Sequence, residues 1–190
     1  MNLPNKLTVA RILLVPVFMI CASQGFNAGW MLAAGIVFAA ASFTDYLDGY
    51  LARRKGMVTD FGKFADPLAD KLLTTTAFIY MMQMDACHPV VIVIILAREF
   101  AVSGVRMVAA SKNRVIAANM WGKVKTVLQM VTVLVFYVEL PLDIWMGNMT
   151  GSVYTGQIVA NVLCWAVAVV TTLSGVIYLW QNRDCVMQAK

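Results

Sequence analysis

The sequence predicts an all-α, polytopic membrane protein, and three observations lead to that fold class. The 190-residue chain is 61% hydrophobic with a mean hydropathy of +0.74, which is more apolar surface than one soluble core of this length needs. The apolar residues gather in runs of about 20 residues, the length that crosses a bilayer. Charged residues make up only 13% of the chain and cluster between those runs.

Six such runs predict six transmembrane helices. A helix satisfies its own backbone hydrogen bonds in lipid, and no alternating strand pattern competes with it. The first run lacks a small-residue cleavage site, so we expect it to be retained. We expect one domain covering residues 1–190. The runs lie near residues 7 to 24, 30 to 51, 64 to 84, 89 to 110, 120 to 142 and 154 to 180.

The basic residues predict the orientation, because Lys and Arg favour cytoplasmic loops. The segments Gly25 to Gly29, Asp85 to His88 and Glu139 to Gly151 contain neither Lys nor Arg. We therefore expect both termini, and the loops after the second and fourth helices, to be cytoplasmic. The basic residues of the segments expected to be cytoplasmic are Lys6, Arg11, Arg53, Arg54, Lys55, Lys63, Lys112, Arg114, Lys123, Lys125, Arg183 and Lys190.

The chain begins with a short polar lead, Met1 to Lys6. Pro4 and Asn5 can start a helix, so we expect a short N-terminal helix that lies at the membrane interface before the first transmembrane helix.

The net charge of +5 raises the question of a nucleic-acid partner. The basic residues border apolar segments and form no exposed stripe, so we expect no nucleic acid. An anionic membrane surface and phosphorylated substrates fit the charge better. The cysteines have no spacing typical of a zinc site, and we expect them to be ordinary apolar residues. They are Cys21, Cys87, Cys164 and Cys185.

Aspartates crowd one part of the chain. Asp45 and Asp48 are three residues apart near the end of the second helix, and Asp66 and Asp70 are four apart at the start of the third. Each pair shares a helical face, and the short loop makes the two helices antiparallel neighbours. Four carboxylates pointing into one space would repel each other unless a cation neutralised them. Oxygen ligands suit Mg²⁺ or Mn²⁺.

The alternative for these carboxylates is a cluster of salt bridges. Its cations would be Arg53, Arg54, Lys63 and Lys71. The high cost of charge within a membrane favours the metal site instead.

Small residues lie beside the aspartates. Gly49 and Ala52 leave a smooth patch after Asp48 where a ligand can approach the backbone, and Gly62 does the same on the opposite helix. Small residues in membrane helices also serve close helix packing, so both interpretations stay open.

The whole segment reads Asp45-x2-Asp48-Gly49-x2-Ala52-Arg53-x8-Gly62-x3-Asp66-x3-Asp70, and it resembles the signature of the CDP-alcohol phosphatidyltransferase family. The resemblance implies a membrane enzyme that transfers a phosphatidyl group from a CDP-linked lipid to an alcohol and releases CMP. It also implies two divalent metal ions, a site facing the cytoplasm and a homodimer.

The resemblance implies a role for each matched position. Asp45, Asp48 and Asp66 would bind metal, and Asp70 would bind the second metal and act as the general base. The residues that would contact the CDP group are Gly49, Ala52 and Arg53.

A second basic set bears on the acceptor. Arg98 and Arg106 are eight residues apart on the fourth helix and so lie nearly on one face, and Lys123 and Lys125 begin the fifth. We expect them to bind the phosphate of the acceptor. The alternative is snorkelling or ion pairing, for which Glu99 is available.

Four further stretches resemble the bacterial phosphatidylglycerophosphate synthases, a branch of this family. This resemblance implies CDP-diacylglycerol and glycerol 3-phosphate as substrates and the bacterial cytoplasmic membrane as the location. The stretches are Asp66-Pro67-Leu68-Ala69-Asp70-Lys71, Ala97-Arg98-Glu99-Phe100, Gly122-Lys123-x-Lys125 and Pro4-Asn5-x2-Thr8-x2-Arg11.

The last of these stretches places three polar side chains at three-residue steps on one helical face. Asn5 and Thr8, with Arg11, could line the entrance for the CDP-lipid headgroup. Helix capping by Asn5 and cytoplasmic anchoring by Arg11 explain them about as well.

Three alternatives stay open. The same chemistry could use inositol phosphate or serine as the acceptor. Intramembrane carboxylates also mark metal-ion transporters, although those here lie at helix ends and not near the bilayer middle. A nonenzymatic scaffold leaves the aspartates unexplained. Residues 33 to 41 and 152 to 166 are rich in small side chains and could pack internally or against a second copy.

Overall fold

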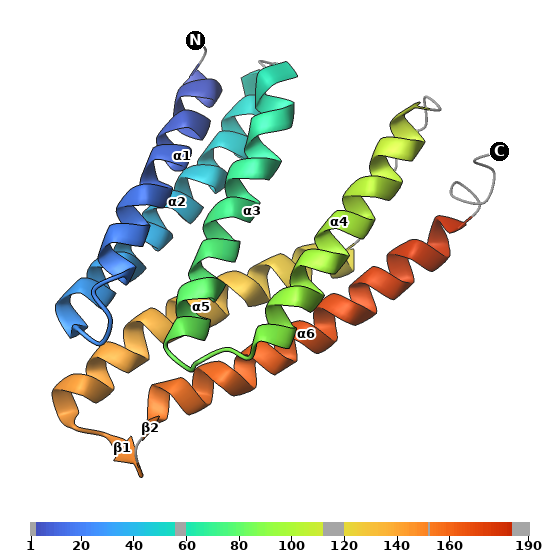
Figure 1. Cartoon of the computed structure of the whole chain (residues 1–190). Helices are drawn as coiled ribbons and strands as arrows, with labels where there is room; N and C mark the ends of the chain where they lie inside the picture. The colour runs from blue at the N-terminus through green and yellow to red at the C-terminus, as the bar shows by residue number, and fades with distance from the viewer. Residues whose placement is uncertain (1–2, 56–59, 112–119, 152, 184–190) are drawn as a thin grey trace.

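The computed structural model describes the backbone of residues 3–55, 60–111, 120–151 and 153–183, and the side chains of residues 9–44, 71–110, 120–149, 151 and 153–183. Six helices run in alternating directions through these residues (Figure 1). The elements are α1 (Leu3–Ala22), α2 (Ala28–Lys55), α3 (Asp60–Gln83), α4 (Pro89–Ser111), α5 (Met120–Met146), β1 (Met149–Thr150), β2 (Val153–Tyr154) and α6 (Thr155–Gln181).

The all-helical class is confirmed in the described part of the chain, where six helices each overlap one apolar run. Two of them, α5 and α6, are long and apolar enough to cross a membrane. Shorter apolar stretches, Val9–Ala22 and Ala28–Thr44, lie in α1 and α2. Large apolar side chains face outward on several helices, with Ile36, Phe100 and Val162 all well exposed, as expected of surfaces that meet lipid.

The prediction of a separate interfacial helix at the N-terminus is wrong. From Leu3 the chain belongs to α1, which continues without a break to Ala22. Pro4 lies in the first turn, where its missing N–H would have no helical partner in any case. Nothing between Pro4 and the apolar run breaks the helix, so the polar lead simply extends it.

The turn between α5 and α6 also differs from expectation. We expected a loop from Glu139, but α5 continues through Pro141 to Met146. Its end is held to α6, because the carboxylate of Asp143 accepts a hydrogen bond from the backbone N–H of Gly156. The two-residue strands β1 and β2 then form an antiparallel hairpin that the sequence did not predict.

An aromatic cluster forms the centre of the core. The ring of Phe18 on α1 lies 5.5 Å from that of Tyr137 on α5, 6.1 Å from Phe38 on α2 and 6.2 Å from Tyr80 on α3. Gly35 permits this packing, since a Cβ there would lie 3.0 Å from the Cβ of Tyr137. At Gly35, therefore, the small residue serves packing within the chain.

The arrangement of the helices places a pocket between α3, α4, α5 and α6. The helix α4 packs mainly against α6, whereas α3 packs mainly against α1. Contact between α3 and α4 is limited, and α5 crosses behind both (Figure 1). Most of the side chains that line this pocket are polar.

Candidate functional site

A pocket of about 400 Å³ lies where α3, α4, α5 and α6 meet. Its wall combines basic and hydroxyl side chains with two aliphatic ones. All four residues predicted to bind an acceptor phosphate line it, so the structure brings this set together. The lining residues are Lys71, Thr74, Thr75, Ile95, Arg98, Glu99, Arg106, Gly122, Lys123, Lys125, Thr126, Val127, Gln129 and Tyr178.

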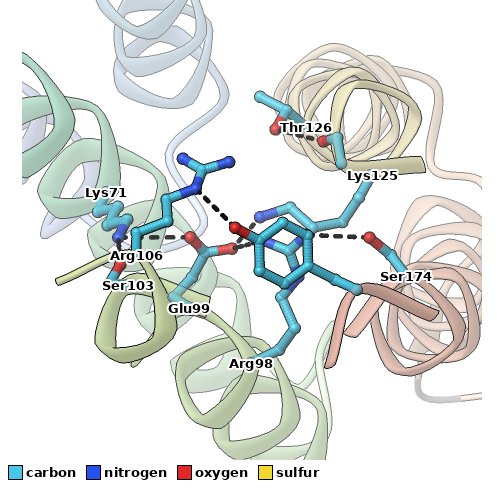
Figure 2. Close-up of polar contacts among 10 residues, drawn as sticks. Lys71, Arg98, Glu99, Ser103, Arg106, Lys125, Thr126 and Ser174 are labelled. Atoms are coloured by element: carbon cyan, nitrogen blue, oxygen red, sulfur yellow. Dashed lines mark hydrogen bonds and ion pairs between the residues drawn. The ribbon is translucent and has the colours of Figure 1, made fainter. Parts of the chain in front are cut away.

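Glu99 organises the cations of this pocket (Figure 2). Its carboxylate accepts a hydrogen bond from the Nζ of Lys125 and another, at 3.2 Å, from Arg98. The Nζ of Lys71 lies 3.5 Å from its second oxygen. The side chain of Glu99 is only 14% exposed, so weak solvent screening makes these pairs stronger than surface ion pairs.

Arg98 crosses the pocket toward α6. Its Nη2 donates a hydrogen bond of 2.9 Å to the hydroxyl of Ser174. Two glycines leave room for this path: a Cβ at Gly175 would lie 3.0 Å from the Cγ of Arg98, and one at Gly122 would lie 3.4 Å from its Nη2. Arg98 is thus held by Glu99 on its own helix and by Ser174 on α6, which favours a stationary charge over a mobile one.

Arg106 lies nearer the end of α4 and is held differently. Its Nε donates to the phenolic oxygen of Tyr178 at 3.3 Å, and its guanidinium carbon lies 5.6 Å from the centre of that ring. Figure 2 shows its two terminal nitrogens pointing away from the other labelled cations. Lys123 also lines the pocket, with no ion-pair or hydrogen-bond partner among the described residues. These two side chains are available to a ligand.

The charges of the pocket do not balance. Lys71, Arg98, Arg106, Lys123 and Lys125 face a single carboxylate, that of Glu99, so four positive charges remain in excess among the lining residues. A partly enclosed site of this charge attracts a multiply charged anion such as a phosphomonoester.

The structure also bears on the alternatives for the basic set. Ion pairing with Glu99 is real for Arg98 and Lys125, as the sequence allowed, and both still line the pocket. Lys71 was considered only as a partner of the aspartates, yet it pairs with Glu99 and donates to Ser103. Tyr178 was not predicted as a site residue. Its only signal in the sequence is a phenolic hydroxyl within an apolar helix. Tyrosines in such helices are common in membrane proteins, so the signal is not specific.

The aspartates occupy the helical positions that the spacing predicted. Asp45 and Asp48 belong to the last turns of α2, and Asp66 and Asp70 to the first turns of α3, two helices that contact one another. Their side chains lie outside the described residues, as do those of Gly49, Ala52, Arg53, Asn5 and Thr8. Because Lys71 follows Asp70 and lines the pocket, the α3 backbone carries the aspartate segment to the edge of the pocket.

The remaining predictions concern residues remote from this pocket. Cys21, Cys87 and Cys164 are free and buried, as expected of apolar residues, whereas Cys185 lies outside the described residues. The imidazole of His88 stacks on Trp165 at 5.7 Å in the turn before α4. Neither group contributes to the pocket.

The chain is similar to a known enzyme family over nearly its whole length. The family model for CDP-alcohol phosphatidyltransferase matches residues 1–179. A CDP-diacylglycerol–glycerol-3-phosphate 3-phosphatidyltransferase of Bacillus subtilis (strain 168) is 48% identical over 143 residues, which cover 70% of this chain and 74% of the relative. An enzyme of the same name from Rickettsia felis is 36% identical over 177 residues, 93% of each chain. A probable phosphatidylglycerophosphate synthase of Mycobacterium tuberculosis is 40% identical over 141 residues, 73% of this chain and 67% of the relative.

Proposed function

Because the chain belongs to the CDP-alcohol phosphatidyltransferase family, we propose that it transfers the phosphatidyl group of CDP-diacylglycerol to sn-glycerol 3-phosphate, forming phosphatidylglycerophosphate and CMP in phospholipid biosynthesis. The observation that carries this choice of acceptor is the pocket with excess positive charge beside the aspartate segment. Serine lacks a phosphate that such a pocket could use, so a phosphorylated acceptor fits better.

The four aspartates would hold two divalent ions, Mg²⁺ or Mn²⁺. Carboxylates spaced three and four residues apart on two contacting helices form an all-oxygen donor set that suits these metals. When bound, the ions would neutralise the diphosphate of the CDP-lipid and the departing CMP.

The other steps fall to residues of the chain. Asp70 takes the proton of the acceptor hydroxyl, whose oxygen attacks the phosphorus of the phosphatidyl group while the bond from that phosphorus to the CMP oxygen breaks. No covalent enzyme intermediate is needed. Gly49, Ala52 and Arg53 contact the CDP group, and Asn5 and Thr8 line the entrance for its headgroup.

The basic residues divide into two groups in this proposal. Arg98 and Lys125 are held by Glu99 and supply fixed positive charge. Arg106 and Lys123 keep donors available and contact the acceptor phosphate directly. An arginine offers paired N–H donors that match phosphate oxygens, so Arg106 is the main phosphate contact.

The six helices cross the bacterial cytoplasmic membrane, with both termini and the active site facing the cytoplasm. The exposed apolar side chains and the two helices that are long and apolar enough to cross a membrane support insertion in lipid. The arginines and lysines of the pocket lie on the side that the positive-inside rule makes cytoplasmic. The active form is a homodimer.

The decisive experiment measures CMP release by the purified protein with CDP-diacylglycerol and Mg²⁺ or Mn²⁺. Glycerol 3-phosphate, serine, inositol phosphate and no acceptor are compared, each with and without a chelator. Release that needs both metal and glycerol 3-phosphate supports the proposal. Release with a different acceptor would keep the family chemistry and change the substrate, and no release with any acceptor would reject the enzymatic role.

A further inference from the structure

Gln129 is the one lining residue of the pocket whose buried amide nitrogen has no hydrogen-bond partner in the described part of the chain. The residue lies on α5, one turn beyond Lys125, and is 4% exposed. Its Nε2 is buried. A buried amide without a partner is costly, and native proteins rarely keep one without a use.

Gln157, another buried glutamine, is an example of an amide with a structural role in this protein. Gln157 donates through Nε2 to the carbonyl of Met84 at 2.7 Å and accepts from the backbone N–H of Tyr154 at 2.9 Å. Both ends of its amide are used, one at the turn after α3 and one at the start of α6. Gln129 makes no such bond, so packing alone does not explain a polar side chain at this position.

The position of Gln129 follows from the geometry of α5. Lys123 and Lys125 lie toward the start of the helix, and Gln129 is six and four residues beyond them, about 9 Å and 6 Å along the axis. Gly122, Lys125 and Gln129 all face the same pocket. A ligand whose phosphate binds at Arg106 and Lys123 can therefore reach Gln129 with its carbon skeleton.

We propose that Gln129 recognises the hydroxyl of the acceptor that does not react, and so selects a phosphorylated vicinal diol. This inference rests on the proposed function. Glycerol 3-phosphate has one reacting primary hydroxyl and one secondary hydroxyl that needs its own partner. A hydroxyl both donates and accepts, as a carboxamide does, so the two groups satisfy each other. An acceptor without that hydroxyl leaves the buried amide unpaired.

The test compares two acceptors, glycerol 3-phosphate and 3-hydroxypropyl phosphate. Both have the phosphate and the primary hydroxyl, and only the first has the secondary hydroxyl. Wild-type protein should prefer glycerol 3-phosphate in kcat/KM by about tenfold or more. Gln129→Met removes the amide at similar volume, so kcat/KM should fall for glycerol 3-phosphate alone and the preference should largely disappear.

Two matched variants separate recognition from structure. Thr132→Val alters a buried hydroxyl of α5 that bonds to Leu128 of its own helix, and it should leave the acceptor preference unchanged. Gln157→Met should lower the melting temperature, whereas Gln129→Met should not, because no internal hydrogen bond is lost. If Gln129→Met does not accumulate in the membrane, Gln129→Leu provides the same comparison.

Two results would overturn the inference. One is an equal loss of kcat/KM with both acceptors in Gln129→Met, which indicates a structural role. The other is an unchanged preference. In either case CMP release by wild-type protein with glycerol 3-phosphate would leave the proposed function intact. Wild-type protein inactive with both acceptors would refute the proposed function and this inference together.

Discussion

Glu99 joins three cations that arise from three helices, and that single carboxylate sets the shape of the charged pocket. Lys71 comes from α3, Arg98 from α4 and Lys125 from α5. Like charges at this separation would repel one another in a weakly screened site, so their common counter-ion is what permits them to share it. Glu99 thereby stabilises a group of like-charged side chains that keeps a net positive charge on the pocket wall.

Replacing Glu99 by Gln should destabilise the protein by about 1–3 kcal/mol, since the partly buried cations lose their counter-ion. Thermal unfolding in detergent measures this loss. The double variant Glu99→Gln with Lys125→Met should recover part of it, because the most buried of the three cations is then absent too. Equal melting temperatures for wild-type protein and Glu99→Gln would show that the ion pairs are not stabilising.

Arg106→Ala should raise the KM for glycerol 3-phosphate by about tenfold or more with a smaller effect on kcat, because a charged hydrogen-bond donor to the phosphate is lost. Steady-state CMP release at varied acceptor concentration measures both constants. Tyr178→Phe is the matched control: it keeps the ring beside Arg106 and removes only the hydrogen-bonded hydroxyl. An unchanged KM in Arg106→Ala would exclude this arginine from the phosphate site.

Asp70→Asn should abolish transfer and leave a folded membrane protein. The substitution preserves the size of the side chain but removes the carboxylate that accepts the proton. CMP release measures the activity, and gel filtration in detergent with a melting curve verifies the fold. Substantial remaining turnover would remove Asp70 from the role of general base.

The helices approach one another most closely where glycine replaces a side chain. Gly156 at the start of α6 faces the α5 backbone, and a Cβ there would lie 2.9 Å from the nitrogen of Leu140 and 3.0 Å from a carboxylate oxygen of Asp143. Those atoms belong to the backbone and to a hydrogen-bonded carboxylate, so displacing either would cost free energy. The pair α5 and α6 depends on this contact.

Gly156→Ala should therefore destabilise the protein by about 1–3 kcal/mol. Gly104→Ala is a suitable comparison, because Gly104 lies within α4 with nothing within 4 Å of its would-be Cβ. There the same change should stabilise by up to about 1 kcal/mol through helix propensity alone. Thermal unfolding of both variants provides the test, and similar melting temperatures would contradict close packing at Gly156.

The helices were far easier to predict than the contacts between them. Runs of apolar residues located all six, because membrane length and backbone hydrogen bonding dictate them locally. The sequence also predicts that Arg98, Arg106, Lys123 and Lys125 converge, and all four line one pocket, whereas their binding of a phosphate stays a prediction. The unpaired amide of Gln129 and the bond from Arg106 to Tyr178 were not predicted, since both depend on packing between helices distant in sequence. The roles of the four aspartates stay predictions.

The proposed orientation makes opposite ends of the molecule accessible from opposite sides of the membrane. Met146 ends α5 beside the hairpin and is well exposed, and Gln181 ends α6 at the opposite end of the molecule (Figure 1). A cysteine at Met146 should react with a membrane-impermeant thiol reagent from outside the cytoplasmic membrane, and one at Gln181 only after permeabilisation. The native Cys21, Cys87 and Cys164 are buried and should react slowly, and Cys185→Ser removes the fourth. The reverse labelling pattern would place the charged pocket on the outer side, where no cytoplasmic CDP-lipid headgroup could reach it.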